Sequence, residues 1–144
     1  MTSYKDLYDA LKLILPSGVN YSFNILTYTD ERNGIIETKK NTCKIHIRQT
    51  RNSNRLVDGS YSSAFAGITF KYVAGNNETD LITGYNFISE VMEIMDSLIN
   101  TVLSTKDGKQ IRIKETRKLG NYEQYWDWNN NCCFNTDYEI EYKQ

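Results

Sequence analysis

Histidine and cysteine, which commonly act as catalytic bases, nucleophiles or metal ligands, are scarce in this chain. Its 144 residues include one histidine, His46, and three cysteines, Cys43, Cys132 and Cys133. A metal site built from them would need ligands from distant segments with no recognisable spacing. The cysteines form no disulfide framework, because their number is odd and two are adjacent. We therefore expect structural thiols and synthesis in a reducing cytoplasm.

Sequence patterns for catalysis or nucleotide binding are lacking as well. A nucleophilic cysteine needs a base or cations nearby to lower its pKa, whereas the residues around Cys132 and Cys133 are neutral or acidic, with Asp127 and Asp137 closest. No GxGxxG or Walker pattern occurs, so no phosphate-binding loop is predicted. We expect neither an enzyme nor a bound cofactor.

Several organising features are also missing. The N-terminus lacks the basic and apolar regions of a signal peptide. The most hydrophobic stretch, residues 81–102, is interrupted by charges every few residues and cannot span a membrane. The length and the lack of a linker predict one domain over residues 1–144. The net charge of −1 gives no overall attraction to nucleic acid or anionic lipid.

The clearest periodicity lies in residues 81–102 and predicts a long amphipathic helix at the centre of the core, capped by Thr79 or Asp80. Its apolar residues fall in one continuous arc, and the acidic and amide residues fill the opposite side. The apolar arc consists of Phe87, Ile88, Val91, Met92, Ile94, Met95, Leu98, Ile99 and Val102.

Strand patterns flank this helix. The best is Thr42–Gln49, where Cys43, Ile45 and Ile47 alternate with Lys44, His46 and Arg48. Further strands are expected over residues 21–28, 35–38, 66–73, 110–115 and 134–143, with a hairpin loop at 29–34, a first helix at 3–15 and an irregular segment at 117–131. This order predicts an α+β fold, a mainly antiparallel sheet with an N-terminal helix and one long amphipathic helix packed on one face.

Basic residues cluster around strand 42–49. They are Lys39, Lys40, Lys44, His46, Arg48, Arg51 and Arg55. This cluster is either a patch for a phosphate backbone or an acidic partner, or a solvated strand face with its loop. Glu139 and Glu141 stand on the outer face of the last strand. If copies of the chain met side by side, the basic and acidic strand faces could pair between subunits.

Two tryptophans, Trp126 and Trp128, lie in the polar segment YWDWNN. In an extended chain both rings would share one face and form a contact surface for a partner. The alternative is that they fold back onto the core.

The order of elements and two segments resemble the tail terminator proteins of long-tailed bacteriophages, also called minor capsid proteins. The strand KIHIRQTR, residues 44–51, resembles the Arg-ended alternating strand that precedes the long helix in that family. The segment NFISEVMEIMDSL, residues 86–98, is similar to the core of that helix. The Tyr- and Asn-rich tail after Gly120 matches no motif of the family.

This resemblance implies a non-enzymatic assembly protein of the virion. Its copies would form a hexameric ring that caps the tail tube and joins it to the head–tail connector protein, after synthesis in the host cytoplasm. The partners implied are other copies of the chain, the tail tube protein and the connector. Arg48, Arg51 and Arg55 would face a lumen through which DNA passes, or pair with acidic residues of the next subunit. The alternatives are another head–tail neck or head-completion protein, and a small cytosolic partner-binding module.

Overall fold

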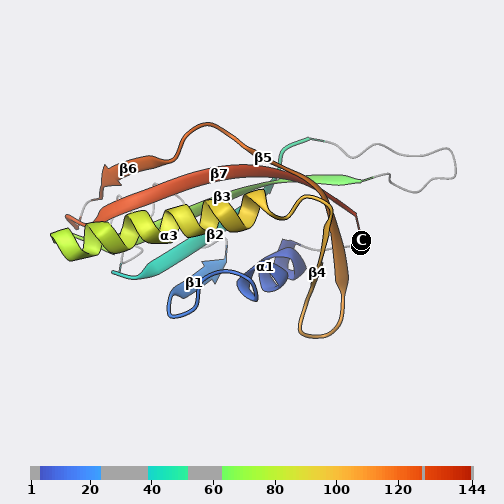
Figure 1. Cartoon of the computed structure of the whole chain (residues 1–144), viewed down its shortest axis with the longest axis horizontal. Helices are drawn as coiled ribbons and strands as arrows, with labels where there is room; N and C mark the ends of the chain where they lie inside the picture. The colour runs from blue at the N-terminus through green and yellow to red at the C-terminus, as the bar shows by residue number, and fades with distance from the viewer. Residues whose placement is uncertain (1–3, 24–38, 52–62, 128, 144) are drawn as a thin grey trace, which may run out of the picture.

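The computed structural model describes residues 4–23, 39–51, 63–127 and 129–143, which form two helices and one seven-stranded sheet (Figure 1). In chain order the elements are α1 (Tyr4–Lys12), β1 (Asn20–Phe23), β2 (Thr42–Gln49), β3 (Ala64–Gly75), α3 (Glu78–Asp96), β4 (Thr101–Ser104), β5 (Gln110–Lys118), β6 (Glu123–Trp126) and β7 (Cys132–Lys143).

The strand order is β1-β2-β3-β7-β5-β4, with β6 paired to the first part of β7. All pairs are antiparallel except β1 with β2, so the sheet is mixed. Figure 1 shows both helices on the same side of the sheet. The predicted α+β class, with helices covering one face of a mainly antiparallel sheet, is confirmed.

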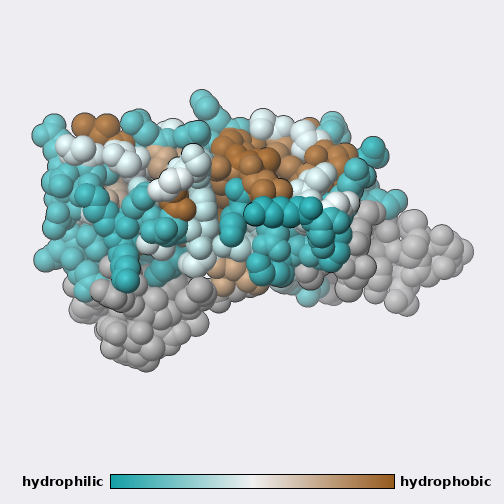
Figure 2. Space-filling view, turned by 90° about the horizontal axis from the view of Figure 1, so that it is seen from below, coloured by the Kyte–Doolittle hydropathy of each residue, from teal (hydrophilic) through white to brown (hydrophobic). Residues whose placement is uncertain are grey.

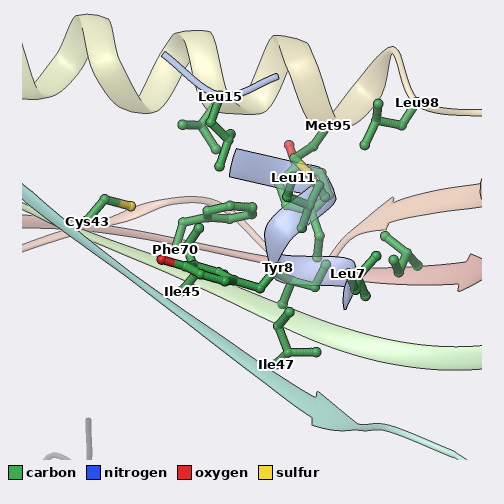
Figure 3. Close-up of a cluster of buried hydrophobic side chains, with 14 of the residues drawn as sticks. Leu7, Tyr8, Leu11, Leu15, Cys43, Ile45, Ile47, Phe70, Met95 and Leu98 are labelled. Carbon is green, nitrogen blue, oxygen red and sulfur yellow. The ribbon is translucent and has the colours of Figure 1, made fainter. Parts of the chain in front are cut away.

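The core lies between the helices and this face of the sheet. Strand alternation directs every second side chain toward it, and Ile45, Phe70 and Ile140 are fully buried there. Side chains from α1 and from the C-terminal part of α3 converge on the same strands (Figure 3). Leu7 and Leu11 of α1 are also fully buried, because the helical spacing of four residues places them on one face.

Helix α3 begins earlier than the apolar periodicity predicted. Asn77 is the N-cap, and its side chain accepts a hydrogen bond from the Asp80 backbone N–H at 2.8 Å. The prediction that Thr79 or Asp80 caps the helix was therefore wrong. Both lie in the first turn, where Asp80 is buried and pairs with Lys40 at 2.5 Å. A short amide at the cap satisfies a backbone donor that the helix itself cannot pair.

Gly84 sets how closely α3 approaches the sheet. A Cβ at this position would lie 2.3 Å from the Phe134 ring and 2.9 Å from the Ala74 Cβ. The lack of a side chain lets the helix rest directly on β3 and β7.

The C-terminal end of α3 corrects a second prediction, because the helix stops at Asp96 and does not continue to Val102. The Ser97 backbone N–H still bonds back to the last turn, but Asn100 adopts a left-handed conformation with φ 61°. The chain then turns into β4, which pairs with β5. Leu98 and Leu103 remain buried on either side of this turn, while Ile99 and Val102, which the helical arc placed in the core, are about half exposed.

Further differences concern the boundaries of other elements. The segment 117–131, predicted to be irregular, contains the end of β5 and all of β6, which pairs with β7. Helix α1 ends at Lys12 instead of residue 15. The predicted hairpin loop at 29–34 and the strand at 35–38 lie outside the described residues.

Candidate interaction surface

The face of the sheet opposite α1 and α3, here called the open face, is covered by no described helix. It carries the ion pairs Arg51–Glu139, Arg117–Glu139 and Lys114–Glu141. Strand register aligns Arg48 of β2, Gly67 of β3, Glu139 of β7 and Arg117 of β5 in one row across four strands. Alternation explains this placement, because the flanking residues Ile47, Ile68 and Ile140 are buried in the core. The outward positions are therefore polar or charged.

Glu139 is the centre of this row. Its carboxylate pairs with Arg51 at 2.6 Å and also with Arg117, and its side chain is only 11% exposed. Burial by itself raises the pKa of this carboxyl, but hydrogen bonds, including those from Arg117 and Arg51, outweigh burial and lower the pKa to about 2. Glu139 thus stays ionised. Across β3 and β7 it links Arg51, which follows β2, to Arg117 of β5.

A second chain of contacts runs beside the first. Arg48 Nη1 donates a hydrogen bond to Thr69 Oγ1 at 2.9 Å, and the Thr69 hydroxyl donates to Asp137. Gly67 leaves room for the arginine, because a Cβ there would lie 3.0 Å from the Arg48 guanidinium carbon and 2.7 Å from a methyl carbon of Thr50. No sequence pattern singles out Gly67 or Thr69, since their role appears only when β2 and β3 are aligned.

Glu141 and Phe65 extend the open face toward the end of β7. Ser63 donates a hydrogen bond to Glu141 at 2.7 Å, and Lys114 Nζ lies 4.0 Å from the same carboxylate. The Arg51 guanidinium stacks over the Phe65 ring at 4.0 Å. A shallow hollow here is lined by Arg51, Phe65, Glu115, Arg117, Glu139 and Glu141.

The predicted interface residues divide into three groups. Arg48, Arg51, Glu139 and Glu141 gather on the open face. Pairing of the basic and acidic strand faces was expected between subunits, whereas in this structure Arg51 pairs with Glu139 of the same chain. Lys44 points to the same side but is largely buried. Arg55 and Trp128 lie outside the described residues.

Trp126 lies at the end of β6 with 55% of its surface exposed. Near β6, Tyr85 of α3 stacks edge-on against Phe134 and donates a hydrogen bond to Gln124 at 2.5 Å. Tyr122 also packs near Tyr85, with ring centroids 6.4 Å apart. Aromatic side chains therefore gather where α3 packs near β6. Trp126, exposed at the end of β6, is available for contact with another molecule.

The side of the molecule on which α1 lies carries a patch of hydrophobic residues bordered by hydrophilic ones (Figure 2). Leu13, just after α1, is 50% exposed. No helix in the described part of the chain is long and apolar enough to cross a membrane.

The cysteines and His46 do not come together. All three cysteines are buried and form no disulfide bond, and they lie on β2 and β7, while His46 is exposed on the open face. Burial raises the pKa of the Cys43 and Cys132 thiols, which disfavours the nucleophilic thiolate. Within the described residues, no group of three or more His, Cys, Asp and Glu side chains is placed to hold a metal ion.

Comparison of the sequence with known protein families and with curated proteins finds no match.

Proposed function

We propose that this chain is a tail terminator of a long-tailed bacteriophage, a non-enzymatic assembly protein whose copies form a ring that caps the tail tube and joins it to the head connector. The observation that carries the proposal is the layering of the fold. An N-terminal helix, β2 and β3, the longer helix α3 and the closing strands follow the order that the resemblance implies, and both helices lie on one face. No described helix covers the other face, which offers a surface for contacts in an assembly.

The open face is suited to line a lumen. Arg51 and Arg117 share Glu139, and Arg48 reaches Asp137 through Thr69, so these arginines are held in place and their charge is balanced nearby. DNA that passes such a surface would meet little net attraction, which favours sliding over binding.

Trp126 is the first candidate for docking to the tube or the connector. Its large exposed ring belongs to the last residue of the edge strand β6, which pairs with β7 and with no other described strand. Exposed aromatic rings are frequent anchors of protein interfaces.

The decisive experiment is negative-stain microscopy of the purified chain mixed with tail tubes assembled from candidate tail tube proteins. We expect ring-shaped density at one end of each tube, and tubes that stop growing once capped. Trp126→Ala should reduce the capped fraction while Leu13→Ala, a change at an equally exposed apolar position on α1's side, should not.

The other outcomes separate the alternatives. Rings that never cap a tube would overturn the terminator role and favour a different neck or head-completion protein. A chain that stays monomeric and ignores tubes at every salt concentration would favour a small partner-binding module.

A further inference from the structure

The C-terminal half of α3 exposes negative charge that nothing in the described chain neutralises. Residues 72–105 contain no lysine, arginine or histidine, and the exposed side of α3 carries Glu90, Glu93 and Asp96. The last turn of α3 has no basic residue, although the negative end of the helix dipole favours cations there. Ile99, which follows directly, is 46% exposed. We call Glu90, Glu93, Asp96 and Ile99 the acidic surface.

Positive charge without a neutralising partner among the described residues occurs on the open face of the sheet, near the C-terminal end of α3. Arg112 of β5 is paired in register with Lys143 of β7 and with Val102 of β4, so the three side chains form one row, here called the basic row. Their inward neighbours Leu103, Ile111 and Tyr142 are buried. Arg112 and Lys143 are exposed, and neither makes an ion pair with a described carboxylate. Like charges directly opposite each other destabilise a strand pair.

The acidic surface and the basic row are similar in make-up but carry charges of opposite sign. Each combines unneutralised like charges with one apolar side chain that is about half exposed, Ile99 at 46% on one and Val102 at 49% on the other. Contact between them would relieve the repulsion within each surface and bury both apolar groups, as in interfaces with an apolar centre and a charged rim.

We propose that the acidic surface of one copy binds the basic row of the next copy. This inference rests on the proposed function in so far as it names the contact that would close the ring. The two surfaces differ and lie on opposite faces of the sheet, so the contact is head-to-tail and each copy keeps one free surface for a further copy. Repetition of the contact gives a closed ring, or a filament if the rotation between copies does not close.

Charge reversal tests this contact directly. Glu90→Lys with Glu93→Lys makes both surfaces basic, and Arg112→Glu with Lys143→Glu makes both acidic. Each double variant by itself should lose self-association, with a dissociation constant raised about a hundredfold or more. An equimolar mixture of the two should assemble again, because each acidic surface then meets a basic one. A chain with all four substitutions should assemble by itself.

Mass photometry and sedimentation velocity measure assembly, and circular dichroism checks that each variant is folded. Lys118→Glu and Glu123→Lys are the matched controls, exposed reversals on β5 and β6 away from both surfaces, and should leave assembly unchanged. If both double variants still form the rings that the wild type forms, the proposed interface is wrong and the terminator role stands. Loss of assembly in the double variants without recovery in the mixture would also overturn it. Oligomers that obey the reversal pattern but never cap tubes would keep the interface and remove the terminator role.

Discussion

At the scale of single residues, Glu139 shows how one side chain organises the open face. It is largely buried, yet its carboxylate remains ionised because Arg51 and Arg117 approach it from opposite sides. Removal of its charge would leave two arginines without their shared partner. Hydrogen bonds that involve charged groups contribute more to stability than neutral ones.

We expect Glu139→Gln to lower the free energy of unfolding by about 1–2 kcal/mol at neutral pH. The folded pKa of about 2 lies below the ordinary value of a glutamate. The stabilisation by Glu139 is therefore complete above about pH 5 and is lost as the pH falls toward about 2. Urea unfolding across this pH range should show a weaker acid dependence in the variant. Glu115→Gln, an exposed change on the same face, is the control, and equal acid dependence of all three proteins would contradict the assignment.

Gly84 permits a second prediction about a single residue. Alanine normally stabilises a helix over glycine by about 1 kcal/mol, but here its Cβ would meet the Phe134 ring at 2.3 Å. Because overpacking of a tight contact costs about 1–3 kcal/mol, we expect Gly84→Ala to be destabilising. Chemical denaturation checks this, with the exposed Asn86→Ala on the same helix as the control. A stabilised Gly84→Ala protein would show that α3 can move away from the sheet at little cost.

At the scale of elements, the start of α3 depends on its cap. Asn77→Ala should lower the free energy of unfolding by about 1 kcal/mol, since the Asp80 backbone N–H loses its acceptor. Asn77→Ser should retain most of the stability, because a hydroxyl can accept the same bond. Thermal and urea unfolding provide the comparison. Asn76→Ala, one residue before the cap, should behave as the wild type, and a loss as large as that of Asn77→Ala would indicate that the cap is not the cause.

At the end of α3, the helical periodicity of the sequence continues into residues that form strand β4. Leu98 and Leu103 are both buried, one in the turn after the helix and one on β4. The apolar residues of the segment TVLS, residues 101–104, fit the apolar arc of a helix and the alternation of a strand equally well. Pairing with β5 decides in favour of the strand, because it satisfies the backbone of residues 101–104.

At the scale of the whole molecule, the acidic surface and the basic row make self-association dependent on salt. The Debye length, over which exposed charges interact, falls from about 14 Å near 0.05 M salt to about 4 Å near 0.5 M. We expect the dissociation constant to rise about tenfold over this range. Sedimentation velocity at several NaCl concentrations measures it, and the four-substitution chain should show the same dependence. Association that strengthens with salt would indicate an apolar contact elsewhere.

The sequence alone was sufficient for the α+β class, the strand 42–49 and the placement of the helices on one face. These conclusions depend on local periodicity, which burial of one side of each element imposes directly. The buried residues Ile45, Ile68, Phe70 and Ile140 were identifiable for this reason.

The tertiary structure decided what depends on register between distant strands. Arg51 and Glu139 are 88 residues apart in the chain, and only the alignment of β2, β3 and β7 brings them into contact. The same holds for Gly67 beneath Arg48, and for Arg112 beside Lys143. Along the strands recognised from alternation, the sequence determined which residues face outward. The pairing of strands determined which of these are neighbours, because register depends on contacts between segments that are distant in the chain.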